Sequence, residues 1–503
     1  MRRALLVGMG LVLVGGVLTP VVTPMGVDSA WAASRAPLPF DFDGDGYADL
    51  AVGVIHEDLR GKRNAGAVQV LYGSAEGATA RDQLWHQGRK GVKGALENGD
   101  RFGTTLASAD FDGDGYADLA VGIPWENVGG HRDAGAVQVL YGGPKGLTAR
   151  DQVWHQGKKG VPGSNEADDL FGWALAAGDF DGDGFADLAV GAPNEDVGDA
   201  RGAGDVVLLR GSRAGLTSAG AEKIRQGRAG LPSQPGQAEG FGWRLVAGDV
   251  NGDGPDDLVV LVHDETDPFP SSDALRGRAV HLLLGSRSGL VLSGSQFFGP
   301  TELGLDPSFF GHMALSDFNG DGRADLAVSA QDRWPGEVAV LHGKADGLHP
   351  APLPAAAKPG VDAVWSLPDV VDEAHERSGA LAYGDFTGDG HTELAIAVTE
   401  GMALIRGTGS GLGTEIVRWP VGNVDAVAGL ALSGGTHDWL VVADSSAKVS
   451  SDRAAGKVSV LQGARSGKPA QITVWHQDSR GIKGATQRDD HFGYAVAGSS
   501  ALG

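Results

Sequence analysis

The chain has 503 residues, of which 82 are glycine, and its formal net charge is −23. The 42% share of apolar residues is enough to bury a core, which excludes global disorder. The absence of cysteine excludes disulfide scaffolds, thiolate zinc sites and cysteine nucleophiles, and the acidity argues against nucleic acid as the main partner.

The N-terminal residues have the pattern of a secretory signal peptide. Arg2 and Arg3 precede an apolar run over residues 4–18, and small residues allow cleavage near Ala32. A transmembrane anchor is the alternative, but the run is shorter than a full span and prolines follow it. We therefore expect residues 1–32 to be removed and the mature protein to be secreted, with no membrane span.

One acidic nonapeptide recurs through the rest of the chain. Its first copy covers residues 41–49, and the next two cover residues 110–118 and 179–187. Looser copies begin at Asp249, Asp317 and Asp385, so that successive copies start 68 to 70 residues apart. A seventh copy is eroded, because the strand-like sequence at 439–442 follows a stretch, 431–438, that has lost the acidic pattern. The sixth unit is therefore short. Such a period predicts a repeat architecture.

Each unit has the layout of four short strands. In the second unit we predict strands at residues 102–109, 119–122, 135–141 and 152–156, separated by glycine-rich turns and without a stretch of helical periodicity. A small sheet of this kind cannot bury both of its faces alone. We therefore predict an all-β fold in which the sheets stack radially as the blades of a β-propeller.

The two ends of the chain predict that the ring is closed. Residues 490–498 resemble the opening strand of a unit whose acidic loop never follows, and Asp41 begins an acidic loop whose opening strand is missing. Joining the two completes one blade and gives seven blades over residues 40–503, after a short linker at 33–39. Closure removes the open sheet edges that invite aggregation. The other six blades are predicted to begin at Phe102, Phe171, Phe241, Phe310, and near Ser378 and Val427.

A Phe-Gly pair, an acidic loop and then Gly191-Ala192-Pro193 resemble the FG-GAP repeat. This is the repeat of the integrin α-subunit N-terminal propeller and of many secreted bacterial proteins, and it extends over almost the whole mature chain. The resemblance implies a seven-bladed propeller with Ca²⁺ in the loops between the first two strands of a blade. It also implies a role in binding or adhesion.

The acidic loops are predicted to bind calcium at up to six sites. In D-x-[DN]-x-D-G-x-x-D, positions 1, 3, 5 and 9 offer side-chain oxygens and position 7 offers a backbone carbonyl, and these are hard donors that suit Ca²⁺. Mg²⁺ is disfavoured because it demands tighter octahedral geometry. The alternative is that Asp-Gly-Asp-Gly serves only to form a turn. This would account for a single copy, but it accounts poorly for six copies that keep the alternating ligands. The expected ligands are Asp41, Asp43, Asp45, Tyr47 and Asp49; Asp110, Asp112, Asp114, Tyr116 and Asp118; Asp179, Asp181, Asp183, Phe185 and Asp187; Asp249, Asn251, Asp253, Pro255 and Asp257; Asp317, Asn319, Asp321, Arg323 and Asp325; and Asp385, Thr387, Asp389, His391 and Glu393.

The number of acids differs between these loops. Loops one to three have four each, whereas loops four to six have three, which predicts weaker binding in the last three. Together the ligand positions hold 21 of the 64 acidic residues, so the rest of the chain carries only −2. The overall acidity therefore reports on metal loops and says little about the charge of a partner.

Two other sets of residues recur. Trp-His-Gln at 85–87, 154–156 and 475–477 is predicted to pack blade against blade, with a carbohydrate-stacking or catalytic role as the alternative. A glutamate lies eight residues after four of the acidic loops, in the loop between the second and third strands. It belongs either to a ligand-binding face or to a solvated acidic rim. These glutamates are Glu57, Glu126, Glu195 and Glu265.

The sequence favours a binding module over an enzyme. It contains no G-x-S-x-G, no H-E-x-x-H and no phosphate loop, and each predicted calcium loop fills its own ligand set, whereas a catalytic metal needs an open position. We expect an adhesion or recognition module for an extracellular protein or glycan. A secreted hydrolase or lyase with its site at the channel mouth is the alternative. A sugar-binding propeller is a third possibility, but Trp125 has no aromatic equivalent in units one or three.

Overall fold

The computed structural model describes residues 38–228, 230–265, 277–299, 311–329, 337–350, 364–366, 380–398, 401–430, 437–463 and 471–497. These residues form strands and turns, and they belong to one compact unit that spans Pro37–Gly503. The described residues contain no helix with the length and apolar character needed to cross a membrane. The predicted signal peptide and most of the predicted linker lie outside the described residues.

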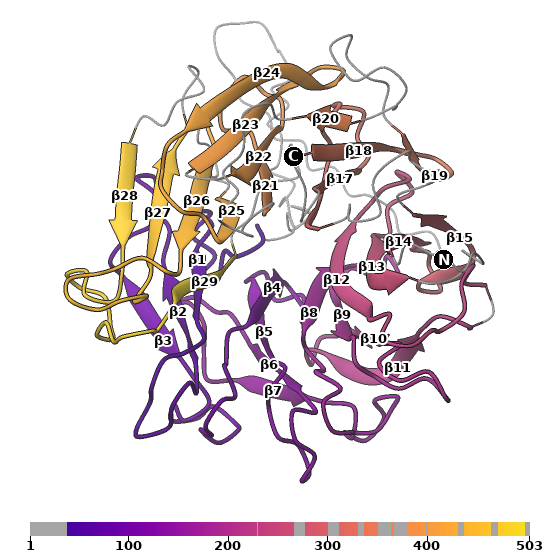
Figure 1. The fold of residues 1–503 in the computed structure, drawn as a ribbon, viewed down its shortest axis with the longest axis horizontal. Coiled ribbons are helices and arrows are strands. Elements are labelled where there is room, and N and C mark those ends of the chain that lie inside the picture. The colour runs from indigo at the N-terminus through magenta and orange to yellow at the C-terminus, as the bar shows by residue number, and fades with distance from the viewer. Residues whose placement is uncertain are drawn as a thin grey trace, which may run out of the picture. The chain divides into compact units, whose positions relative to one another are not determined.

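The strands form seven antiparallel sheets, which are the seven blades (Figure 1). Within a sheet, strands that follow one another in the chain lie side by side. The exception is the sheet that combines the last strand of the chain with the first three strands. Blade one holds β29 (Phe492–Ala497), β1 (Leu50–Val54), β2 (Ala67–Leu71) and β3 (Asp82–Trp85). Blade two holds β4 (Thr105–Ala109), β5 (Asp118–Ile123), β6 (Ala136–Leu140) and β7 (Asp151–Trp154). Blade three holds β8 (Ala174–Gly178), β9 (Asp187–Ala192), β10 (Asp205–Arg210) and β11 (Thr217–Ile224).

The other four blades repeat this order. Blade four holds β12 (Phe241–Gly248), β13 (Asp257–Glu265), β14 (Gly277–Leu284) and β15 (Val291–Phe298). Blade five holds β16 (Met313–Ser316), β17 (Asp325–Ser329), β18 (Glu337–Lys344) and β19 (Gly347–Pro350), with β20 (Val364–Ser366) also paired to β18. Blade six holds β21 (Leu381–Gly384), β22 (Glu393–Val398), β23 (Gly401–Thr408) and β24 (Gly411–Trp419). Blade seven holds β25 (Ala426–Leu430), β26 (Trp439–Asp444), β27 (Lys457–Gln462) and β28 (Gln471–Trp475).

The ring is closed by the two ends of the propeller, as the sequence predicts. β29 pairs antiparallel with β1, so that Val496 lies opposite Val52, although the two residues are more than 440 positions apart. The eroded seventh unit is also confirmed, because Trp439 begins the second strand of a regular four-stranded blade. In the short sixth unit, only residues 399 and 400 separate β22 from β23.

The apolar core lies between blades. The described residues form seven buried clusters, and each combines side chains from two neighbouring sheets. One cluster, for example, joins Val137 and Val139 of blade two to Val190 and Val207 of blade three. The second and third strands are buried along almost their whole length because a neighbouring sheet covers each of their faces. The stability of each blade therefore depends on its neighbours.

Where a blade opens with a Phe-Gly pair, the pair contacts the preceding blade. The amide of Phe171 donates to the carbonyl of Ala134 at 3.0 Å, and its ring is fully buried. Gly172 follows with φ = +92°, a conformation that favours glycine, and its carbonyl oxygen lies against Gly122 on the second strand of the preceding blade. Gly103 and Gly242 repeat this contact at two further interfaces. The sequence motif is thus an interblade joint.

Two segments whose sequences break the repeat, His263–Gly277 and Leu348–Ser378, fall mostly outside the described residues. The structure describes only their ends and β20. The predicted opening of blade five at Phe310 and the predicted opening of blade six near Ser378 also lie outside them, whereas β16 and β21 themselves are described.

Candidate metal centres

Five of the acidic loops connect the first and second strands of a blade, and loop one leads into β1, the second strand of blade one. In all six the first aspartate organises the loop. One carboxylate oxygen of this aspartate accepts the amide of position 5 at 3.1–3.2 Å, and the other accepts the amide of position 6 at 2.8–3.0 Å. The glycine at position 6 allows the sharp turn, as at Gly115 with φ = +91°. These bonds hold the backbone of all six loops in the same form.

Oxygen atoms of the predicted ligands meet in four of these loops. Three carboxylates in each set offer atoms that all lie within 4.8 Å of one another. Such a donor set fits a divalent cation that prefers several hard oxygens, as Ca²⁺ does. The four sets are Asp41, Asp43 and Asp45; Asp110, Asp112 and Asp118; Asp179, Asp181 and Asp183; and Asp385, Asp389 and Glu393.

In loops four and five, an asparagine replaces one of these acids. The side-chain oxygen of Asn251 accepts the amide of Asp253 at 2.9 Å, and Asn319 accepts the amide of Asp321 at the same distance. The carboxylates of position 3 in loops one and two accept the corresponding amide at 3.2–3.3 Å. The asparagines therefore keep the loop geometry and offer a neutral oxygen in place of a charged one.

The ninth position has a second role that the sequence does not reveal. Asp49 is fully buried, and its two carboxylate oxygens accept the amides of Phe42 at 2.9 Å and Gly73 at 2.8 Å. It thereby fastens the acidic loop to the turn after the third strand. Asp118, Asp257 and Asp325 make the same two kinds of bond. In the sixth loop Glu393 accepts the amide of Thr387 instead.

Burial gives these ninth-position acids unusual pKa values. It raises the pKa of Asp49 to about 8, that of Asp118 to about 9, and that of Asp257 to about 7, and the negative charges of neighbouring loop aspartates add to the effect. A divalent cation among these carboxylates would stabilise their charged forms and so lower these pKa values. The electrostatics of the loops therefore fit the predicted ion.

An arginine faces the third position in each of the loops with four acids. Arg81 pairs with Asp43, and Arg150 pairs with Asp112. In the third loop Arg210 lies 3.2 Å from Asp181 and 2.9 Å from Asp187. Each arginine offsets one acidic charge of its loop. In loop five Arg323 lies 3.7 Å from Asp321 and does the same, and Asp256 adds a fourth acid to loop four. The number of acids at the ligand positions is therefore not a sufficient basis for ranking the six sites.

Three of the recurrent glutamates bind the preceding blade: Glu57 and Glu195 are buried and Glu126 is half-buried, which corrects both interpretations drawn from the sequence. Gln87 donates to Glu126 at 2.7 Å, and Gln156 donates to Glu195 at 2.9 Å. Gln477 makes the equivalent bond to Glu57 and so joins blade seven to blade one. These glutamates form neither an exposed ligand face nor a solvated rim. They accept the glutamine of Trp-His-Gln from the preceding blade, and the predicted packing role of that motif is confirmed. The side chain of Glu265 lies outside the described residues.

Glu57 gives the closed ring a pH dependence. It is 4% exposed, and burial raises its pKa to about 7, with a further contribution from Asp58. A pKa above that of the unfolded chain means that the fold favours the protonated form. The contribution of Glu57 to stability is complete below pH about 4.5 and is lost as the pH rises through about 7.

Replacing Glu57 with glutamine should remove this loss, because the amide stays neutral and still accepts a hydrogen bond. We expect Glu57→Gln to raise the free energy of unfolding by roughly 3 kcal/mol at pH 8 and by little at pH 5. Urea unfolding with calcium present at both pH values measures the difference. The exposed Glu76→Gln is the control. An equal effect of Glu57→Gln at both pH values would rule out ionisation as the cause.

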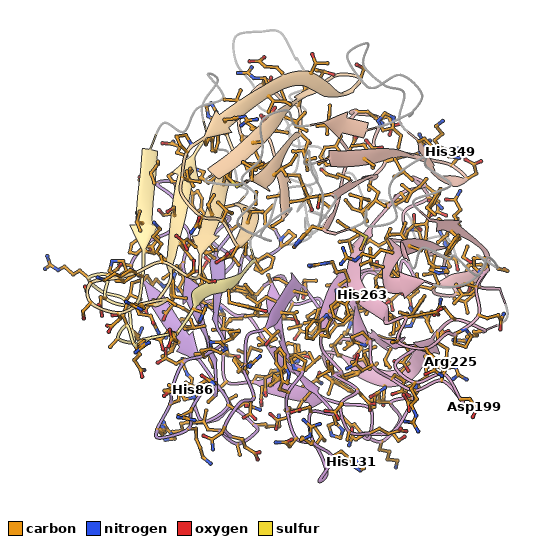
Figure 2. All side chains as sticks on the ribbon, viewed as in Figure 1. His86, His131, Asp199, Arg225, His263 and His349 are labelled. Carbon is orange, nitrogen blue, oxygen red and sulfur yellow. The ribbon has the colours of Figure 1, made fainter. Side chains whose placement is uncertain are left out.

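Aromatic side chains also gather on the face away from the acidic loops. Trp125, in the loop after β5, lies 5.7 Å from Trp173, which lies 4.8 Å from Trp243, measured between ring centroids. His263 continues the row at 4.4 Å from Trp243. Figure 2 shows His263 nearer to the middle of the ring of blades than His131 or Asp199. The sequence suggests that Trp125 has no aromatic counterpart, but the neighbouring blades supply one from another position of the repeat.

Comparison with known proteins identifies the repeat. The FG-GAP repeat family matches residues 37–71, 102–140, 171–209 and 309–341. Phosphatidylinositol-glycan-specific phospholipase D of Rattus norvegicus is 36% identical over 160 residues, which are 32% of this chain and 18% of that protein. Integrin alpha-PS2 of Drosophila melanogaster is 33% identical over 31% of this chain and 11% of its own length. Integrin alpha-E of Homo sapiens is 31% identical over 46% of this chain and 19% of its own.

The chain therefore spans less than a fifth of the length of these relatives. Among solved structures, a lectin from Agrocybe aegerita that recognises non-reducing terminal N-acetylglucosamine has the same kind of fold. Its TM-score is 0.51 at 15% sequence identity, over 92% of this chain and 95% of the lectin. At this identity the likeness shows the fold alone.

Proposed function

We propose that this integrin-alpha-like FG-GAP propeller is a secreted, calcium-binding module that holds an extracellular protein or glycan on one face. Its predicted signal peptide and its resemblance to integrin α chains support a place outside the cell. The calcium loops serve the scaffold, and the ligand meets the opposite face. Loops on a rigid scaffold are where binding residues concentrate.

The observation that carries this proposal is the constant form of the six acidic loops. In each loop the same two backbone amides hold the first aspartate, although blades differ in their other acids. Turn formation alone does not require carboxylates whose atoms converge to within 4.8 Å, since their mutual repulsion opposes the fold. A bound cation turns that repulsion into attraction, which explains why several blades retain the set.

The residues that would hold the ion are those at positions 1, 3, 5 and 9, with the carbonyl of position 7. Calcium there would offset two of the negative charges of the loop and tie the first strand of a blade to the second. The loop is also held without the ion, because the ninth-position carboxylate accepts a hydrogen bond from the turn after the third strand. The proposed role of the metal is thus structural.

A binding screen tests the proposed role of the protein. The calcium-saturated chain is presented to arrays of extracellular proteins and of glycans, and we expect saturable binding to a member of one class. Turnover assays with common esters and glycosides run in parallel. Hydrolysis without any stable complex would contradict the proposal and favour a secreted hydrolase with its site at the channel mouth.

A further inference from the structure

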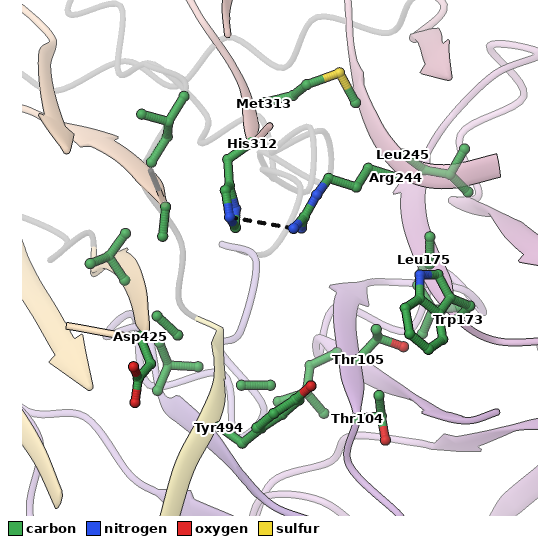
Figure 3. A pocket seen from close by; sticks show the side chains of 18 of the residues that line it. Thr104, Thr105, Trp173, Leu175, Arg244, Leu245, His312, Met313, Asp425 and Tyr494 are labelled. Carbon is green, nitrogen blue, oxygen red and sulfur yellow. Dashed lines mark hydrogen bonds between the residues drawn. The ribbon is translucent and has the colours of Figure 1, made fainter. Parts of the chain in front are cut away.

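A pocket of about 660 Å³ opens where the first strands of the seven blades converge (Figure 3). Its size falls within the range of small-molecule sites, roughly 300–1,000 Å³. All seven blades contribute to its wall, and the chemically distinctive side chains are Trp173, Trp243, Arg244, His312, Asp425 and Tyr494. The six acidic loops contribute none of its lining, so the pocket is separate from the predicted metal centres.

Arg244 has no carboxylate partner among the residues that the structure describes. Its Nη2 lies 3.3 Å from Nε2 of His312, and this is its one hydrogen bond within the described part of the chain, where its buried Nε has no partner. Burial and the positive charge of Arg278 lower the pKa of Arg244 to about 10, and the one acidic group that acts in the opposite sense is the phenol of Tyr494, not a carboxylate. The same surroundings hold the pKa of His312 well below its ordinary value, so His312 is a neutral partner.

The acid in the pocket wall does not neutralise Arg244. Figure 3 shows Asp425 and Arg244 on opposite sides of the pocket. Asp425 instead accepts the amide of Ser445 at 2.8 Å and its hydroxyl at 2.6 Å. Arg244 is thus a half-buried guanidinium that lines a cavity and has no carboxylate partner in the described part of the chain. A carboxylate ligand would complete this arrangement, because arginine binds carboxylates through two parallel hydrogen bonds.

Aromatic rings line the same pocket. Trp173 and Trp243 belong to its wall, and Tyr494, which is 43% exposed, lines the part contributed by β29. The row of indoles continues outward to Trp125, and the guanidinium of Arg101 lies 4.4 Å from the centroid of that ring. A run of aromatic side chains that leads out of a pocket suits a ligand made of successive rings with apolar faces, such as a sugar chain.

We propose that the pocket binds an acidic glycan, with the carboxylate of a uronic acid unit at Arg244 and neighbouring sugar rings against the row of indoles. The inference rests on the proposed binding function and names its ligand class. A peptide carboxylate could also satisfy Arg244, but it would leave the row of Trp125, Trp173 and Trp243 without a role.

Titration calorimetry with a matched pair of ligands tests the inference. One is a tetrasaccharide of alternating glucuronate and N-acetylglucosamine, and the other is the same compound with its carboxylates reduced to alcohols. We expect the acidic form to bind the calcium-saturated chain about tenfold more tightly or better, because a charged hydrogen bond is lost on reduction. Arg244→Gln should abolish this preference, and Trp173→Ala should weaken both ligands. Arg132→Gln, which alters an exposed arginine paired with Asp133 and Asp168, should change neither.

The possible failures are distinguishable. Equal binding of the two tetrasaccharides, or an unchanged preference in a folded Arg244→Gln, would overturn the role of Arg244. If neither sugar binds but an acidic peptide binds and Arg244→Gln abolishes that binding, the ligand class is wrong. If neither binds while the array screen finds a ligand elsewhere on the propeller, the pocket proposal fails and the binding function stands. Melting curves of each variant establish that it is folded.

Discussion

Removing calcium is expected to lower the melting temperature of this chain by about 10 °C or more. A ligand that binds only the folded state contributes about 2.7 kcal/mol per site when its free concentration is 100 times its Kd. Three such sites would already exceed the stabilisation that most single substitutions can remove. Without the ion, the clustered carboxylates of the acidic loops repel one another inside partly buried turns.

Differential scanning calorimetry with excess calcium and with excess chelator measures this effect. Magnesium at the same concentration should restore little of the loss, because it demands tighter coordination. Asp114→Ala removes one predicted ligand and should reduce the calcium-dependent shift, whereas the exposed Asp199→Asn, in a loop of the opposite face, should leave it intact. An identical melting temperature in calcium and in chelator would contradict the assignment.

The second large effect is expected at the joint between blades two and three. A Cβ atom at Gly122 would overlap the backbone oxygen of Gly172 and the hydroxyl of Thr105. The backbone cannot move away without opening the packed interface between the two sheets. Gly122→Ala should therefore lower the free energy of unfolding by about 3 kcal/mol or more.

Gly143 offers a matched control in the same blade. A Cβ atom there would meet only the methyl group of Thr148, at 3.4 Å, an ordinary contact. Gly143→Ala should therefore change the unfolding free energy by less than about 0.5 kcal/mol. Comparable urea midpoints for Gly122→Ala and the unmodified chain would show that the interblade contact is not needed. Similar losses in both variants would point to a general cost of replacing glycine.

The fold could be predicted from the sequence because each blade has its own local sequence pattern. The 68 to 70 residue period, the Phe-Gly pairs and the strand patterns predict seven blades, and the split unit at the two ends predicts the pairing of β29 with β1. Even the eroded seventh blade keeps the apolar run from Trp439 that forms its second strand. These are short-range signals that one chain repeats many times.

Contacts between blades were harder to foresee. Glu57 and Gln477 are 420 residues apart, and nothing local distinguishes a buried glutamate from an exposed one in a polar loop. The row of Trp125, Trp173 and Trp243 combines two different positions of the repeat, so alignment of the units does not reveal it.

One missed feature did leave a signal. Arg81 and Arg150 each lie 38 residues after the aspartate at position 3 of their acidic loop, and each pairs with that aspartate. Their equal spacing could have identified them as partners of the loops. Arg210 lies at the end of β10, the third strand of its blade, whereas Arg81 and Arg150 come just before a fourth strand. Only the structure shows that Arg210 has the same role.

The most direct test of the central claim is a count of bound calcium. The chelator-treated chain is dialysed against rising concentrations of radioactive Ca²⁺, and bound ions per chain are measured at equilibrium. The structure predicts saturation with more than one ion and at most six, and a lower plateau for Asp114→Ala. A chain that binds no calcium at millimolar concentrations, while remaining folded, would contradict the assignment of the acidic loops as metal centres.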